Sequence, residues 1–452
     1  MKARLAFAAL MALAGCMPAT LPEVATRARI AETTLPPMKR FADTSVPAPV
    51  RSNVDLARDF LALTFRMESG RKLPVLTRFD EPIGVAITGA PPVTLAADLS
   101  SLTQRLRQEA GINIRTAPAD QAQIIIEAVS RRDIQRMLPQ AACFVAPNVR
   151  SLAEYRSARR HPRTDWTLLR DRRQLAIFLP NDASPQEARD CLHEELAQAL
   201  GPLNDLYRLS DSVFNDDNVH TVLTGFDMLV LRITYDSALR PGMTEAQVAA
   251  ALPAILSRLN PRGDRLPARQ TPPTPRAWST AIETALGRDT SFAQRHRAAR
   301  TGLRIATAEN WQDHRRGFAH YTMGRVLQMR DPAAAQHHYT LANQFYAANP
   351  GTELHRAYTV TQMAAFALSR GDGKTALALT RGHLRTAEQA QNAALLATLQ
   401  LIRAEAMALE GRVTEARGLR LDSIGWARYG FGPDWAVRAK LREIAALSPR
   451  SG

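Results

Sequence analysis

Beyond its amino terminus the sequence has no apolar run of about twenty residues, the length that a transmembrane helix needs. We therefore expect no membrane-spanning helix. The chain also has only three cysteines in 452 residues, which allow at most one disulfide within it. With 45% hydrophobic and 22% charged residues, the composition is that of a globular protein of about two or three domains.

The amino terminus predicts export from the cytoplasm. Lys2 and Arg4 precede a short apolar run, Leu5–Leu13, which is typical of a signal peptide. The run leads into Leu-Ala-Gly-Cys16, which resembles the lipobox of bacterial lipoproteins and implies cleavage before Cys16, lipidation of that residue and membrane attachment through the lipid. Because Met17 follows the cysteine, the resemblance implies a place in the bacterial cell envelope, at the outer membrane and facing the periplasm. The alternative is an ordinary secretory signal with a chance cysteine.

The other two cysteines, Cys143 and Cys191, form the one remaining pair if Cys16 carries lipid. In an oxidising compartment we expect a disulfide between them, and the alternative is two buried, reduced thiols. An unstrained bridge of this kind stabilises a fold by roughly 2–4 kcal/mol. Since Cys191 lies just before a run of charged residues with helical spacing, the bridge would brace that helix.

Positive charge exceeds negative charge, with 58 Lys and Arg residues against 43 Asp and Glu and a formal net charge of +15. In a cytoplasmic protein such a charge would indicate nucleic acid as a partner. Outside the cytoplasm we expect anionic lipid headgroups or acidic polymers instead, and no nucleic-acid partner.

From about residue 53 the pattern of apolar residues predicts a mixed α/β domain. A strand of alternating residues at Ile83–Thr88 and an amphipathic helix ending at Gly111 begin it. Ser184, Pro185 and Glu187 together form a helix start, because they supply a cap, a suitable first residue and a negative charge near the positive end of the helix dipole. The other elements predicted are a helix at Asp55–Met67 and strands at Ile112–Arg115, Ala122–Val129, Ala142–Ala146 and Leu175–Leu179.

The segment Cys191–Asp205 has the spacing of a zinc-peptidase active-site helix without its histidines. Such a helix carries ligands at i and i+4, a general base beside the first, and a glycine where the chain turns toward a third ligand. Glu194, Gln198 and Asn204 occupy the three ligand positions, and Glu195 occupies the position of the base. These oxygen donors suit calcium or magnesium better than zinc. A surface helix with polar residues opposite an apolar stripe is the alternative interpretation.

His193 suggests a second alignment of the same motif. If His193 were the first ligand, the second position would be Ala197, which cannot bind metal, so the alignment anchored on Gly201 fits better. His193 could still act with Glu195 as an acid/base pair, or it could simply be packed and hydrogen-bonded.

The order of these elements resembles the zincin metallopeptidase fold, in particular its metzincin branch. Downstream, Phe214 in the segment Asp211–Asp216 lies where that branch has a methionine under the metal, and Leu223–Asp236 resembles the closing helix, capped by Thr224. His193–Asp205 together with Asp211–Asn218 also resembles a family of proteobacterial lipoproteins, domain-of-unknown-function family 2927.

The carboxyl-terminal part has a different pattern. After a helix at Thr244–Leu259 a stretch rich in Pro and Gly marks a linker, and from Arg276 the chain is rich in alanine without strand-like alternation. Turns at Arg330-Asp-Pro, Gly371-Asp-Gly and Gly411-Arg-Val recur about every forty residues, which resembles tetratricopeptide repeats. A plain helical bundle is the alternative. Such hairpins favour binding of envelope proteins or peptides.

The sequence thus predicts an α+β fold with a zincin-like domain followed by an all-α repeat domain. The expected divisions are a signal peptide (1–15), a flexible tether (16–52), the zincin-like domain (53–259), a linker (260–275) and helical repeats (276–448). Two functions remain open. The first is a lipid-anchored, non-catalytic binding protein without a cofactor, and the second is a hydrolase in which Glu195 activates water on a divalent metal held by Glu194, Gln198 and Asn204.

Overall fold

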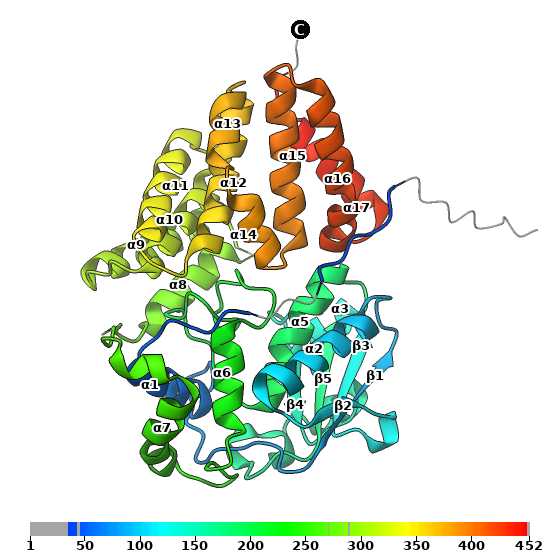
Figure 1. The fold of residues 1–452 in the computed structure, drawn as a ribbon, viewed down its shortest axis with the longest axis vertical. Helices are drawn as coiled ribbons and strands as arrows, with labels where there is room; N and C mark the ends of the chain where they lie inside the picture. Colours follow the sequence, from blue (N-terminus) through cyan, green and yellow to red (C-terminus); the bar gives the residue numbers. More distant parts are fainter. Residues whose placement is uncertain (1–34, 43–45, 270, 288–289, 450–452) are drawn as a thin grey trace, which may run out of the picture. The chain divides into compact units, whose positions relative to one another are not determined.

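The structure is a computed structural model, and it describes residues 35–42, 46–269, 271–287 and 290–449. The predicted signal peptide and the lipidation site Cys16 lie outside these residues. Among the residues described, no helix combines the length and the apolar character that crossing a membrane requires. Figure 1 shows the chain coloured from its amino terminus to its carboxyl terminus.

A five-stranded sheet forms the centre of the α/β part, in the order β2-β1-β3-β5-β4. The first four strands in this order are parallel, and β4 pairs with β5 in the antiparallel sense. Because both faces of the inner strands are covered, β5 is a continuous apolar run, and β3 is apolar except for Glu127. The strands are β1 (Ile83–Gly89), β2 (Ile114–Thr116), β3 (Ile124–Val129), β4 (Phe144–Pro147) and β5 (Leu175–Pro180).

Helices α2 and α5 contact the sheet and each other (Figure 1). Their apolar side chains join those of the strands, α1 and α6 in one hydrophobic core. The helices of this part are α1 (Asn53–Thr64), α2 (Leu95–Ala110), α3 (Arg131–Met137), α4 (Leu152–Ala158), α5 (Pro185–Leu200), α6 (Gly225–Thr234) and α7 (Glu245–Leu259), with short 3-10 turns at Ala119–Gln121, Pro162–Thr164, Trp166–Leu168 and Pro261–Arg265.

The ends of these helices follow from their capping residues. The Ser184 side chain accepts a hydrogen bond from the Glu187 backbone, as the sequence predicted. Gly111 ends α2 in the left-handed conformation, with φ of 70°, which a residue with a Cβ adopts at a cost. Thr224 and Asp227 form a reciprocal capping box at the start of α6. The predicted α+β class is therefore confirmed.

From Arg276 onward every regular element in the described residues is a helix. The predicted repeat turns join α10 to α11, α12 to α13, and α15 to α16. Glycines allow two of these hairpins to pack closely, since a Cβ on Gly324 would lie 2.7 Å from the ring of Tyr339 and a Cβ on Gly430 would lie 2.5 Å from the backbone nitrogen of Ala394. The helices are α8 (Arg276–Leu286), α9 (Phe292–Ala308), α10 (His314–Leu327), α11 (Pro332–Ala347), α12 (Glu353–Ser369), α13 (Gly373–Leu379), α14 (His383–Gln389), α15 (Ala393–Leu409), α16 (Val413–Phe431) and α17 (Asp434–Ala445).

Part of the predicted tether lies on the last helices. The backbone nitrogen of Lys39 donates to the Gly425 carbonyl at 3.0 Å, and the ring of Phe41 stacks on Trp426 with 4.4 Å between centroids. Arg428 also donates to the Pro36 carbonyl at 2.8 Å. Residues 36–41 are therefore held on α16, while the flexibility of the rest of the tether stays a prediction.

The first half of α5 contacts the helical part. The Gln186 side chain donates to the Asn392 side chain at 3.1 Å, and its oxygen accepts from the Ala394 backbone at 2.9 Å. Arg189 donates to the Gln391 carbonyl. The α/β and helical parts thus share polar contacts within one compact unit, residues 35–452. The predicted domain boundaries stay predictions.

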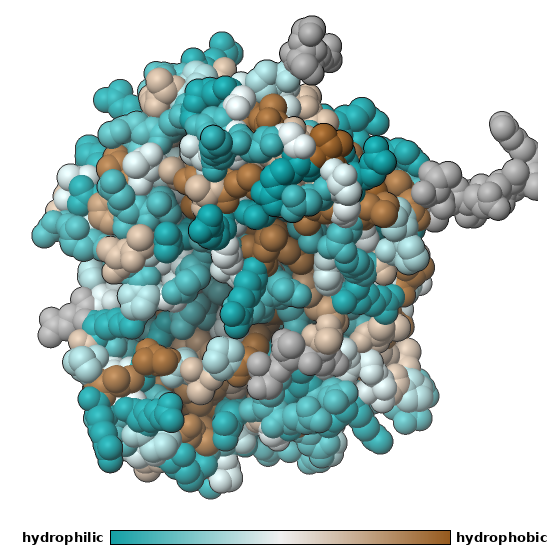
Figure 2. Space-filling model, turned by 45° about the horizontal axis from the view of Figure 1, so that its top comes forward, coloured by the Kyte–Doolittle hydropathy of each residue, from teal (hydrophilic) through white to brown (hydrophobic). Residues whose placement is uncertain are grey.

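Hydrophilic residues cover most of the face in Figure 2, and hydrophobic residues are scattered among them. The large apolar side chains that are exposed include Met329, Trp435 and Leu421.

Candidate functional site

Helix α5 carries the residues that the sequence singled out, and it is buried on both of its sides. The predicted apolar stripe, Leu192, Leu196 and Ala199, is fully buried. The opposite side is also covered, because Glu195 is only 5% exposed and Gln198 only 7%. Glu194 is partly exposed. The helix therefore does not line an open groove along its whole length.

His193 has a structural partner. Its Nδ1 accepts a hydrogen bond from the backbone nitrogen of Leu223 at 3.1 Å, just before α6. Burial, with the positive charges of Arg189 and Arg105, lowers the pKa of His193 well below its usual value and keeps the ring neutral. In this arrangement Nδ1 holds the chain ahead of α6 and does not face Glu195 as a proton acceptor.

The end of α5 and the predicted third ligand are also held by hydrogen bonds. Asn204 donates its side-chain amide to the Ala62 carbonyl at 2.9 Å. Arg172 donates to the carbonyls of Gln198 and Gly201, each at 2.5 Å. Asn204 thus ties the loop to α1, and its amide nitrogen is occupied. Within the described ranges, no group of three or more His, Cys, Asp or Glu side chains is arranged to hold a metal ion.

Instead, the structure gathers five carboxyl groups around the middle of α5. This acidic cluster consists of Glu68, Glu194, Glu195, Asp205 and Asp216. Glu68 and Asp216 are exposed, Glu194 and Asp205 are partly buried, and Glu195 is buried, so the cluster runs from the solvent into the protein. The gathering is notable in a chain whose basic residues outnumber its acidic ones.

Burial raises the pKa of every member of the acidic cluster, and the charges of nearby carboxyl groups raise it further. The pKa of Glu194 rises to about 8, mainly through burial and then through the charges of Asp216 and Glu68. Although Asp216 reaches the solvent, the protein packed around its carboxyl group, together with the charges of Glu68 and Glu283, raises its pKa to about 7. Glu195, at the buried end, has one oxygen, Oε2, without a hydrogen-bond partner. A cation entering the cluster would reduce the repulsion between the carboxyl groups and would give this oxygen a partner.

A pocket of about 210 Å³ lies between the loop at Asp217–Val219 and the helices α8, α10, α11 and α12. Its lining is largely aromatic. We call it the aromatic pocket, and it is lined by Asp217, Asn218, Val219, Leu286, Phe318, Tyr321, Arg325, Tyr346, His355 and Tyr358.

Tyr207 connects the aromatic pocket with the acidic cluster. Its ring centroid lies 6.2 Å from that of Phe318 in the pocket. Burial raises the Tyr207 pKa, and the charges of Asp216 and Glu283 raise it further. The neighbouring residues Asp216 and Asp217 belong to the cluster and to the pocket lining, respectively. The two features are therefore adjacent.

Three histidines hold the loop between the acidic cluster and the aromatic pocket. His355 pairs with Asp217, with 2.9 Å between Nε2 and Oδ2, and both side chains are buried. His314 Nε2 donates to the Tyr207 carbonyl at 2.7 Å, and His220 Nε2 donates to the Ser210 carbonyl at 3.0 Å. Burial lowers the pKa of His314 to about 4, so this ring is neutral at pH 7 and carries its proton on Nε2. The loop is thereby fixed against α10 and α12.

Phe214, in the position of the predicted metal-supporting residue, is fully buried. The turn around it is held by Asp227, whose carboxylate accepts from the Ser212 hydroxyl at 2.5 Å and from the Val213 backbone at 3.1 Å. Burial raises the Asp227 pKa to about 6 against these hydrogen bonds. Asp227 therefore joins the turn to the start of α6, a role that the sequence analysis did not predict.

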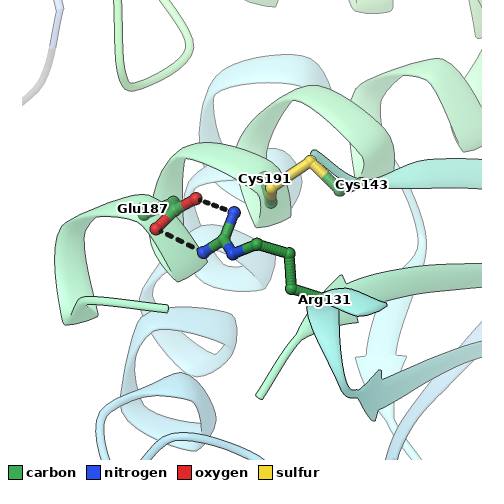
Figure 3. The surroundings of a disulfide bond; sticks show 4 residues. All are labelled: Arg131, Cys143, Glu187 and Cys191. Carbon is green, nitrogen blue, oxygen red and sulfur yellow. Dashed lines mark hydrogen bonds and ion pairs between the residues drawn. A yellow bond between two sulfur atoms is a disulfide. The ribbon is translucent and has the colours of Figure 1, made fainter. Parts of the chain in front are cut away.

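The predicted disulfide between Cys143 and Cys191 is confirmed, with 6.0 Å between the Cα atoms. Figure 3 shows it joining the segment before β4 to α5. In the same view the Arg131 guanidinium donates two hydrogen bonds to the Glu187 carboxylate, at 2.7 and 2.9 Å. Both contacts fix α5, and with it Glu194 and Glu195.

A family model described as "Protein of unknown function (DUF2927)" matches residues 53–254, from the start of α1 into α7. The match includes Glu68, α5 and the loop with Asp205 and Asp216, and it ends before the helices that line the aromatic pocket. No curated protein and no solved structure matches the chain.

Proposed function

We propose that this chain, whose residues 53–254 belong to the DUF2927 family, is a lipid-anchored, non-catalytic envelope protein that binds positively charged peptides. One observation carries the proposal: the aromatic pocket borders a cluster of carboxyl groups that ends at the unpaired Oε2 of Glu195. The predicted lipid on Cys16 would attach this binding site to the membrane.

The chemistry of the two features suits a lysine or arginine side chain. Aromatic faces attract cations by roughly 0.5–1 kcal/mol at exposed sites and by about 2 kcal/mol where water is excluded. Tyr321, Tyr346 and Tyr358 line the pocket. The raised pKa values of the carboxyl groups beyond them would fall when a cation enters, so that these groups ionise beside it, and Glu195 Oε2 has no hydrogen-bond partner among the described residues. An extended peptide could place its apolar side chains in the pocket and a cationic one in the acidic cluster.

Binding is favoured over catalysis because two of the predicted site residues are committed to structural hydrogen bonds. His193 uses Nδ1 to accept from Leu223, and Asn204 uses its amide to hold α1. Of the predicted ligands, Glu194 alone belongs to the acidic cluster.

The test is peptide binding by the full chain in detergent. Fluorescence anisotropy would compare a labelled peptide that contains lysine and tyrosine with the same peptide carrying norleucine for lysine. We expect Asp216→Asn and Tyr321→Leu each to weaken binding of the lysine peptide about tenfold, which corresponds to ~1.4 kcal/mol. Asp120→Asn, which removes an exposed carboxylate outside the cluster, is the matched control.

Equal binding of the lysine and norleucine peptides would refute the charge preference. Absence of binding to any peptide of a mixed library would refute the function itself.

The hydrolase interpretation is favoured by one observation, the buried carboxyl group of Glu195 with its raised pKa. Burial and the charges of Glu194 and Glu68 raise that pKa, as expected at many sites of acid–base chemistry. Mass spectrometry of a peptide library incubated with Ca²⁺, Mg²⁺ or Zn²⁺ would decide. Cleavage that disappears in Glu195→Gln would establish a hydrolase and overturn the binding-only proposal.

A further inference from the structure

The helices α10 and α11 approach each other closely at two glycines. A Cβ on Gly317 would lie 2.9 Å from the ring of Tyr346, and one on Gly324 would lie 2.7 Å from the ring of Tyr339. His320 lies three residues after the first glycine and four before the second, so all three share one helix face. That face is turned toward α11.

On α11 the residue that meets His320 is His338. The two Nδ1 atoms are 3.0 Å apart. Because each nitrogen can be a donor or an acceptor, this contact requires one ring to carry its proton on Nδ1 and the other to accept it. The ring of Phe345 stacks on His320, with centroids 5.7 Å apart and planes 12° apart, and fixes its orientation.

The separation of the two nitrogens is also that of two ligands on one metal ion. Imidazole nitrogens bind Zn²⁺ at 2.0–2.1 Å, so two ligands at ordinary bond angles lie about 2.8–3.4 Å apart. Imidazole suits zinc and copper in particular. His320 and His338 are both partly exposed, which leaves room for water to complete the coordination.

We propose that His320 and His338 bind one divalent transition-metal ion, Zn²⁺ or Cu²⁺, through their Nδ1 atoms. The ion replaces the proton between the rings, and that proton moves through solvent to Nε2 of its own ring. Both imidazoles stay neutral, and water molecules supply the remaining ligands. The bound ion cross-links α10 to α11, at residues that do not line the aromatic pocket.

One positively charged side chain lies near the pair. The guanidinium of Arg316 would repel a metal cation bound by the two histidines. Its position is fixed by the Phe345 ring, over which it lies, and by the Trp311 carbonyl, to which it donates.

The experiment is isothermal titration of Zn²⁺ and Cu²⁺ into the full chain, produced without a histidine tag. We expect one equivalent of tight binding, weakened at least tenfold in both His320→Gln and His338→Gln. His161→Gln, which removes an exposed histidine outside the helical part, is the control and should change nothing. Electron paramagnetic resonance of the Cu²⁺ complex should show coupling to two nitrogens in the parent and to fewer in each variant.

Circular dichroism would first establish that the variants fold. Binding of the same strength in parent and variants, or a Cu²⁺ spectrum without nitrogen coupling, would overturn the assignment. So would the absence of any metal-dependent rise in the melting temperature of the parent, since a ligand that binds only the native state must stabilise it.

Discussion

Replacing Glu194 by glutamine should make the protein more stable at neutral pH and should change how its stability depends on pH. Glutamine has almost the same shape as glutamate but cannot ionise, so the substitution removes a titratable group from the acidic cluster. The pKa of Glu194 is about 8 in the folded protein against 4.5 in the unfolded chain. Between these two values the folded state binds more protons than the unfolded state. The contribution of Glu194 to the free energy of unfolding is therefore fully present below pH 4.5 and is lost as the pH rises toward 8.

The size of the effect follows from the two pKa values. For one isolated group with these values, the free energy of unfolding falls by roughly 2.5 kcal/mol between pH 5 and pH 7. The neighbouring carboxyl groups titrate together with Glu194, so the loss belongs to the acidic cluster as a whole. Allowing for the partial exposure of Glu194, we expect Glu194→Gln to be more stable than the parent by about 1–3 kcal/mol at pH 7 and by little at pH 5.

Urea denaturation at pH 5, 6, 7 and 8, followed by circular dichroism, measures this difference. Glu81→Gln, which removes an exposed carboxylate, should follow the parent at every pH. If the curves of Glu194→Gln and parent run parallel from pH 5 to pH 8, the electrostatic reasoning is wrong. A loss of stability at pH 7 would show instead that the carboxylate is ionised and paired in the folded protein.

Two further predictions concern packing and the disulfide. Gly430→Ala should destabilise the protein by about 1–3 kcal/mol, because the new Cβ would lie 2.5 Å from the backbone of Ala394. Gly418→Ala on the same helix is the control. Because a Cβ there would have nothing within 4 Å, this variant should be more stable than the parent by about 0.5–1 kcal/mol. Melting temperatures of the two variants test this pair, and similar shifts in both would contradict it. Replacing Cys143 and Cys191 by serine should lower the free energy of unfolding by about 2–4 kcal/mol. A reductant should lower the melting temperature of the parent to that of the double variant. An unchanged melting temperature would refute the contribution of the disulfide.

The fold could be predicted from the sequence wherever local chemistry was explicit. Alternation of apolar residues identified the strand that became β1, and Ser184 with Pro185 identified the start of α5. The recurring turns at Gly371 and Gly411 identified two helical hairpins. Both glycines adopt positive φ, 74° and 76°, a conformation that favours glycine at the end of a helix. The likeness to zincins and to tetratricopeptide repeats stays a prediction.

The site was predicted less well, because its residues come together only through tertiary contacts. Glu194 and Glu195 were found from helical spacing. Glu68 is remote in sequence and lies in no motif, so only the packing of the loop after α1 brings it to α5. The roles expected for His193 and Asn204 depended on both side chains facing a cleft. Spacing cannot show that a buried backbone group, Leu223 or Ala62, needs these side chains as partners.

The contact of residues 36–41 with α16 has a consequence for how the chain is made. This segment precedes its partners Gly425, Trp426 and Arg428 by most of the chain and is therefore synthesised long before them. Contacts between such distant parts of a chain form late and slow its folding. If Cys16 is lipidated, the segment next to the membrane reaches its final position only after α16 has been translated and exported. A chain truncated before α16 would therefore leave Phe41 without the aromatic ring on which it stacks.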